Sequence, residues 1–148
     1  MSDKFKLTMA QLNPTVGDFD ANLAKARIAF EHARADGADM LALPEMFLTG
    51  YQVQDLVQKP AFIAEAQAKL AAFAAECADG PTIGIGVPLR DGDQVFNCYA
   101  ILQDGKIATQ IRKHHLPNYK VFDEERTYNH GDIHGPYVVN GVRIGSPI

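Results

Sequence analysis

The chain has 148 residues, of which 47% are hydrophobic and 22% are charged. This length corresponds to about one domain, and the composition is typical of a globular protein that buries a hydrophobic core. The formal net charge is −4 and the acidic and basic residues are mixed, which argues against a surface for nucleic acid or anionic lipid. A small-molecule substrate or a protein partner is favoured.

The sequence also indicates the cellular compartment of the protein. The start, MSDKFKLTMAQ, has no signal segment, and no apolar run approaches the roughly 20 residues that a membrane helix needs. The two cysteines, Cys77 and Cys98, lie far apart and form no CxxC pair. We therefore expect a cytoplasmic protein that does not enter a membrane.

Two strands are predicted in the first third of the chain. Residues 4–13 place Phe5, Leu7 and Met9 on alternate positions, which is the period of a strand with one apolar face. Residues 38–45 form a short apolar run that predicts a second, buried strand.

A helix is predicted after each of these strands. Residues 20–37 offer Asp20 as N-cap and Gly37 as a stop, and the helix between them has an apolar stripe formed by Leu23, Ala26, Phe30 and Ala33. The alanine-rich residues 60–80 predict a second helix, with Pro60 in its first turn. Alternation of strand and helix favours a layered α/β fold.

The pattern then changes to strands joined by tight turns. Residues 82–89, 95–102 and 106–113 each predict a strand, and the pairs Asp91-Gly92 and Asp104-Gly105 between them are strong hairpin signals. A β-meander is therefore expected after the first two helices.

The last third of the chain is less regular. Residues 114–135 follow neither a helical nor a strand period and are long for a simple connection, so they are either a functional loop or disordered. Residues 136–148 predict a hairpin that turns at Asn140-Gly141 and whose last strand runs to Ile148.

An acid stands at the end of the second predicted strand. Leu41, Leu43 and Glu45 share one face by strand alternation, so Glu45 follows two core residues at the carboxyl end of a strand, where α/β folds place their sites. A partly desolvated carboxylate is suited to act as a general base. The pattern is equally compatible with a solvated acid at a strand end.

Lys113 raises a similar question at the end of the third strand of the meander. Alternation places it on the face of Ile107, Thr109 and Ile111. A buried ammonium is costly unless it is paired, so a partner such as Glu45 is expected. The alternative is a lysine that extends along the strand end into solvent.

Other motifs favour structural roles. Gly84 and Gly86 lack the third glycine and the helix of a dinucleotide-binding loop, and are interpreted as close-packed strand glycines. Cys77 and Cys98 are interpreted as small buried hydrophobes, not nucleophiles. No metal site is expected from four histidines in the irregular region, namely His114, His115, His130 and His134.

Three segments together carry a resemblance to a known family. LPEMFLTGY (43–51), RKHHLPNYKVFDEER (112–126) and VRIGSPI (142–148) resemble the nitrilase, or carbon-nitrogen hydrolase, superfamily in order and spacing. The phrase LPNY with VFDE is similar to the amide-hydrolysing domain of glutamine-dependent NAD synthetases. The resemblance implies an α/β fold of the nitrilase type, an α-β-β-α sandwich, of which residues 1–148 would be the N-terminal part and the synthetase domain would be absent.

The resemblance also implies a mechanism based on a Glu, Lys, Cys triad. Glu45 would be the general base and Lys113 would stabilise the oxyanion, while the nucleophilic cysteine would be the residue that follows Ile148, so that residues 1–148 alone would be inactive. Tyr51, Tyr119 and Glu124 would surround the substrate.

Partners and cofactors follow from the same resemblance. The substrate would be glutamine or a related small amide, and the ammonia would pass to a synthetase domain of the same chain. That domain would use ATP and Mg²⁺, whereas residues 1–148 would need no metal or cofactor, and the complete protein would be a homo-oligomer. A stand-alone amidase or carbamoylase of the superfamily, and a non-catalytic fragment with an interaction role, are the alternatives.

Overall fold

The computed structural model describes residues 4–148 and contains one five-stranded sheet. Its strands lie in the order β1-β2-β3-β4-β5, in which β2 pairs parallel with both β1 and β3, and β4 pairs antiparallel with both β3 and β5. Their bounds are β1 Leu7–Met9, β2 Met40–Ala42, β3 Thr82–Asp91, β4 Gln94–Gln103 and β5 Lys106–Arg112. The predicted order of strands and helices is confirmed.

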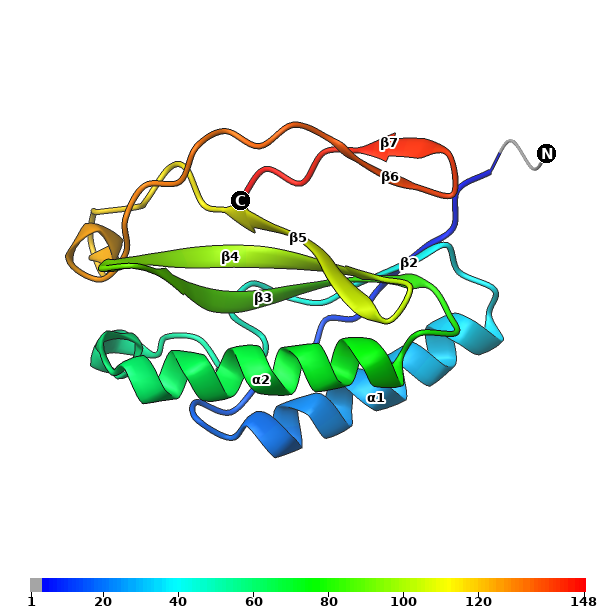
Figure 1. The fold of residues 1–148 in the computed structure, drawn as a ribbon, viewed down its shortest axis with the longest axis horizontal. Coiled ribbons are helices and arrows are strands. Elements are labelled where there is room, and N and C mark those ends of the chain that lie inside the picture. The colour runs from blue at the N-terminus through cyan, green and yellow to red at the C-terminus, as the bar shows by residue number, and fades with distance from the viewer. Residues whose placement is uncertain (1–3) are drawn as a thin grey trace.

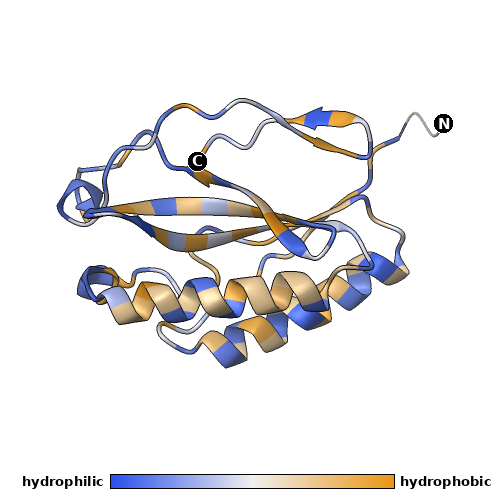
Figure 2. Ribbon diagram, in the orientation of Figure 1, coloured by the Kyte–Doolittle hydropathy of each residue, from blue (hydrophilic) through white to orange (hydrophobic). Residues whose placement is uncertain are grey.

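Both long helices lie on one side of this sheet, which we call the helix face (Figure 1). They are α1 (Phe19–Ala35) and α2 (Pro60–Glu76), and a short 3₁₀ helix, η1 (Gln54–Gln58), precedes α2. The apolar stripes of the two helices pack on alternate strand residues to form the main core, which includes Leu23, Phe30, Leu41, Leu70, Phe73, Ile83, Ile85, Ala100 and Leu102. Figure 2 shows hydrophobic residues along β3 and β4 in the middle of the molecule.

The opposite side of the sheet, the outer face, carries the C-terminal third of the chain (Figure 1). The irregular region contains a 3₁₀ helix, η2 (Glu124–Arg126), and is followed by a separate hairpin of β6 (Tyr137–Val139) and β7 (Val142–Ile144). A second cluster of buried residues lies between this hairpin and the sheet, and consists of Met40, Ile101, Ile111, Tyr137 and Val139. The region 114–135 is therefore an ordered loop over the outer face.

The tight turns have the backbone that their sequences require. Asp104-Gly105 and Asn140-Gly141 form two-residue loops in which all four residues have positive φ, as in the mirror-image turns that suit hairpin twist. Between β3 and β4 the loop is Gly92-Asp93, one residue later than the predicted Asp91-Gly92, because β3 stays paired as far as Asp91.

Three local expectations need correction. The N-cap of α1 is Asp18, whose Oδ1 accepts a hydrogen bond from Ala21 N at 3.1 Å, while Asp20 lies in the first turn. The second predicted strand is shorter, because pairing as a strand ends at Ala42. The last strand ends at Ile144 and, within residues 4–148, pairs with β6 alone, so it does not continue to Ile148.

A β-bulge in β5 changes which residues share a face. The register between β4 and β5 shifts so that Leu102 pairs with Ile107 and Ile101 pairs with Thr109, which leaves Ala108 as the extra residue. Ile107 consequently packs in the core on the helix face, whereas Ile111 belongs to the cluster on the outer face. The prediction that Ile107 shares a face with Ile111 and Lys113 is therefore wrong.

Within residues 4–148, neither α1 nor α2 has the length and apolar character needed to cross a bilayer.

Candidate active site

Glu45 reaches the outer face because the backbone crosses the sheet directly over Gly86. A Cβ on Gly86 would lie 2.0 Å from Met46 N and 2.5 Å from the carbonyl carbon of Glu45, so only glycine allows this crossing. Hydrogen bonds hold the segment there, from Gly86 N to Pro44 O at 3.1 Å and from Leu48 N to Gly86 O at 3.1 Å. Leu41 and Leu43 remain in the core of the helix face, so the prediction that Glu45 shares their face is wrong.

Lys113 follows β5 on the outer face, beside Asn97 of β4. The backbone N–H of Lys113 donates to Asn97 O at 2.8 Å, and its carbonyl accepts from Gly131 N at 2.8 Å. The Lys113 Nζ lies 2.8 Å from Glu45 Oε1, and Asn97 Nδ2 donates to the same oxygen at 2.6 Å. Residues from the end of β2, from β4 and from the end of β5 thus meet at one point.

Glu124 of η2 completes the cluster from the long loop. Its Oε2 lies 3.0 Å from Lys113 Nζ, and its Oε1 accepts a hydrogen bond from the Tyr51 hydroxyl at 3.2 Å. The Glu124 backbone N–H donates to Pro117 O, which folds the loop back on itself. Lys113 therefore lies between two carboxylates that are 79 positions apart in the sequence (124 − 45).

The electrostatics of this cluster favour a permanently charged lysine. Burial by itself would lower the pKa of Lys113, but the hydrogen bonds and charges of Glu45 and Glu124 outweigh that effect and raise the pKa above its usual range. The side chains of Lys113 and Glu124 are 10% and 7% exposed, whereas that of Glu45 is 35% exposed. Glu45 is thus the most exposed of these three charged side chains.

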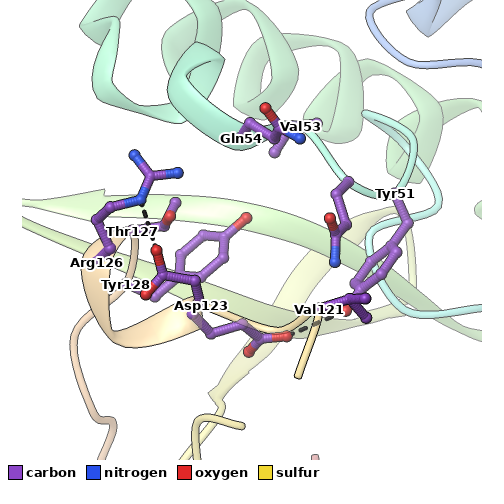
Figure 3. A pocket seen from close by; sticks show the side chains of 10 residues that line it. Tyr51, Val53, Gln54, Val121, Asp123, Arg126, Thr127 and Tyr128 are labelled. Atoms are coloured by element: carbon purple, nitrogen blue, oxygen red, sulfur yellow. Dashed lines mark hydrogen bonds and ion pairs between the residues drawn. The ribbon is translucent and has the colours of Figure 1, made fainter. Parts of the chain in front are cut away.

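Two hollows adjoin the cluster. Figure 3 shows the first, which is lined by residues from 51–54 and 121–128, including Tyr51, Glu124 and Tyr128. The second is lined by Glu45, Tyr99 and the segment Ser146–Ile148. Burial raises the pKa of the Tyr51 and Tyr128 hydroxyls, so both stay neutral donors at neutral pH.

The remaining candidates lie elsewhere or have other contacts. Tyr119 is 62% exposed and packs edge-on against Phe122, so the structure brings Tyr51 and Glu124, but not Tyr119, into contact with the cluster in the described part of the chain. Cys77 and Cys98 are buried, and burial raises the pKa of each thiol to about 12. Cys98 lies next to Asn97 on β4 but alternates to the opposite face.

The histidines of the long loop make local contacts. The ring of His114 stacks edge-on against His115 at 4.6 Å between centroids, and His114 Nδ1 lies 2.7 Å from Gly131 O. Among residues 4–148 no group of three or more histidine, cysteine or acidic side chains is arranged to hold a metal ion.

Comparison with known proteins identifies the family of this chain. The family model described as carbon-nitrogen hydrolase matches residues 6–148, which is nearly the whole chain. The chain belongs to the carbon-nitrogen hydrolase family. The three segments that carried the resemblance contain Glu45, Lys113 and Glu124, and the third of them is residues 142–148.

Curated relatives of this carbon-nitrogen hydrolase chain are named glutamine-dependent NAD(+) synthetase. The one from Rhodobacter capsulatus is 50% identical over 148 residues, which is 100% of this chain and 27% of the relative. The one from Thermotoga maritima is 38% identical over 146 residues, which is 98% of this chain and 25% of the relative. The chain thus spans about a quarter of the length of these relatives.

Solved structures show the same fold. A glutamine-dependent NAD+ synthetase from Acinetobacter baumannii, in complex with ADP, matches with a TM-score of 0.86 and 31% identity over 94% of this chain and 26% of its own. An amidase of the nitrilase superfamily from Nesterenkonia AN1 matches with a TM-score of 0.75 and 19% identity over 90% of this chain and 50% of its own. The mixed α/β fold with its central sheet is therefore that of the nitrilase superfamily.

Sequence reasoning missed two residues of this site. Asn97 could have been noticed as a lone amide inside the apolar strand VFNCYAIL. Gly86 was interpreted as a close-packed strand glycine, which the structure confirms, but the segment that packs on it could not be identified without the tertiary fold.

Proposed function

We propose that this chain is the amide-hydrolysing part of a glutamine-dependent NAD synthetase. It would release ammonia from glutamine and pass it to a synthetase domain that uses ATP and Mg²⁺ in the same cytoplasmic protein. The observation that carries the proposal is the ammonium of Lys113, buried between Glu45 and Glu124, in a chain that is 50% identical to a protein of that name.

The charge of the cluster fits an amino-acid amide as substrate. With both carboxylates ionised, Lys113 neutralises only one of them, so the site carries an excess negative charge. An α-ammonium group is the part of glutamine that such a site would attract. A simple aliphatic amide has no such group.

The proposed chemistry is attack by a cysteine thiolate on the side-chain amide. We propose that this cysteine follows Ile148, because Ser146–Ile148 and Glu45 line the same hollow. Glu45 would remove the thiol proton, because a thiol is largely protonated at neutral pH.

Lys113 would stabilise the tetrahedral oxyanion that forms on attack. Its charge is already in place and largely shielded from water, so it would need little rearrangement in the transition state. Ammonia would leave first, and water would then hydrolyse the glutamyl thioester. Tyr51, Tyr119 and Glu124 would bind the substrate.

The stand-alone amidase alternative is not favoured. The amidases among the solved structures are 18–19% identical to this chain, which supports the fold alone, whereas a solved synthetase is 31% identical and a curated relative of that name is 50% identical.

The test uses the full reading frame that encodes this chain. In the Glu45→Gln variant, NAD synthesis from glutamine should fall at least about tenfold, because loss of a general base typically costs about 10²–10⁴ in rate. NAD synthesis from added ammonia should be kept, because the amide donor is bypassed. Failure of ammonia to rescue synthesis, with ATP binding intact, would contradict the proposal.

A further inference from the structure

Asn97 is the buried polar residue of the site to which neither the motifs nor the proposed chemistry gives a role. It lies on β4 and is 0% exposed, among strand residues that are otherwise mostly apolar. Burying an amide is costly unless its groups are hydrogen-bonded. The Nδ2 of Asn97 donates to Glu45 Oε1 at 2.6 Å, whereas its Oδ1, which is also buried, has no hydrogen-bond partner within residues 4–148.

The same residue is tied to Lys113 through its backbone. The Asn97 carbonyl accepts from Lys113 N at 2.8 Å, so one residue of β4 contacts both members of the pair. The amide cannot turn its oxygen toward Glu45 without placing it against an ionised carboxylate, so the nitrogen must face that group. Asn97 is therefore a fixed donor.

The two donors to Glu45 converge on one oxygen. In the part of the chain that the structure describes, both Asn97 Nδ2 and Lys113 Nζ reach Oε1. The last side-chain torsion of a glutamate has only weak conformational preferences. With one flexible ammonium as its partner, the carboxylate could therefore rotate and swap the positions of Oε1 and Oε2. A second donor from a rigid strand holds Oε1 in place and leaves Oε2 to accept a proton.

We propose that Asn97 is a positioning residue that orients the Glu45 carboxylate so that Oε2 serves as the base oxygen. This inference rests on the proposed glutaminase function. Removing the donor would lower turnover through the orientation of Glu45.

The experiment compares Asn97→Leu and Asn97→Asp in the full-length protein, with glutamine as substrate. Both replacements are close in size to asparagine. Neither the apolar leucine side chain nor an ionised aspartate can donate a hydrogen bond. For Asn97→Leu we expect kcat to fall about tenfold to a hundredfold with KM within about threefold, since the lost interaction acts on the base and not on substrate binding.

The pH profile separates this role from a packing role. The acid limb of kcat/KM should move to higher pH by about half a unit or more in Asn97→Leu, and further in Asn97→Asp, where a second carboxylate faces Glu45. The other groups around Glu45 are Lys113 and Glu124 and the neutral phenols of Tyr51, Tyr99 and Tyr128, and they are unchanged in both variants.

Asn22→Leu is the matched control. Asn22 is also 0% exposed, and its amide oxygen and nitrogen are both hydrogen-bonded, to backbone groups of Thr15 and Leu48. We expect this control to lower the melting temperature and leave the acid limb where it is.

The outcomes are separable. No glutamine hydrolysis by the unmodified protein would refute the proposed function itself. Normal hydrolysis with an unmoved acid limb in both Asn97 variants, whether or not turnover falls, would overturn the positioning role. Loss of folded protein in both variants, measured by near-ultraviolet circular dichroism, would also overturn it in favour of a purely structural one.

Discussion

Lys113 and Glu45 differ in how far their side chains are exposed to solvent. The lysine is almost completely enclosed and is kept cationic by two carboxylates, while Glu45 retains an exposed side toward the hollow formed with Tyr99 and Ser146–Ile148. A charge held in a desolvated site acts strongly on a developing oxyanion, and an accessible carboxylate can exchange protons. The two residues therefore suit different steps of one reaction.

The first prediction concerns Lys113→Met, which keeps the length of the side chain and removes its charge. We expect glutaminase turnover to fall at least about 10²-fold, which is typical when one oxyanion donor is lost. Steady-state ammonia release by the full-length protein measures this. The matched control is Lys69→Met, which breaks exposed ion pairs with Asp20 and Glu65 on the helices and should keep turnover. Turnover above about a tenth of the unmodified value in Lys113→Met would contradict the assigned role.

The second prediction concerns the two thiols. Burial raises the pKa of Cys77 and Cys98 to about 12, so at pH 8 each thiol is almost entirely protonated, and reactivity should increase as pH rises. Peptide-mapped alkylation of the native protein at pH 8 should leave both unmodified, and unfolding should expose both. Ammonia release from glutamine by residues 1–148 alone, abolished when either thiol is alkylated, would refute their structural assignment.

At the scale of elements, the site depends on how closely the segment after β2 crosses β3. Glu45 and Met46 pass over Gly86 with no room for a methyl group, and Met46 itself has a positive φ of 51°. A displacement at this crossing would therefore move Glu45, the proposed general base, relative to Lys113.

The third prediction is that Gly86→Ala impairs both stability and catalysis. The new Cβ would meet backbone atoms that cannot turn away, so we expect a destabilisation of about 1–3 kcal/mol or more and a fall in glutaminase turnover. Chemical denaturation and ammonia release measure the two effects. Gly135→Ala is the control, because a Cβ there has no atom within 4 Å and φ is not positive. Equal behaviour of the two variants would show that the crossing tolerates displacement.

At the scale of the molecule, apolar residues are exposed on the outer face and at its edge. β1 is an edge strand, and its Leu7 and Met9 are 47% and 78% exposed beside Met40. Val142 of β7 is 42% exposed. Unpaired strand edges with apolar side chains recruit other chains.

The fourth prediction is that residues 1–148 alone self-associate. Covering a few hundred Å² of apolar surface contributes roughly 5–10 kcal/mol at about 25 cal/mol per Å², which is comparable with the whole stability of a domain. Sedimentation velocity should show growth of larger species with concentration. Met9→Lys on the edge strand should reduce it, and Ile28→Lys on the exposed side of α1 should not. A monomer with a sharp cooperative thermal transition would refute the prediction.

Local sequence patterns determined most of the elements of this protein. The 3.6-residue stripes, Pro60 and Gly37 specified the helices, and Asp104-Gly105 and Asn140-Gly141 specified two turns, because each signal acts within a few residues. The motifs around Glu45, Lys113 and Glu124 indicated the family, and the comparisons confirmed it.

Only the tertiary structure decided which side chains meet and on which face. The bulge at Ala108 and the crossing over Gly86 each break the period-2 rule, and neither can be read from residues nearby, because each depends on how a neighbouring strand pairs or packs. Asn97 became part of the site for the same reason. Its hydrogen bond to Glu45 joins positions 52 residues apart, and such contacts form only when the sheet brings their strands together.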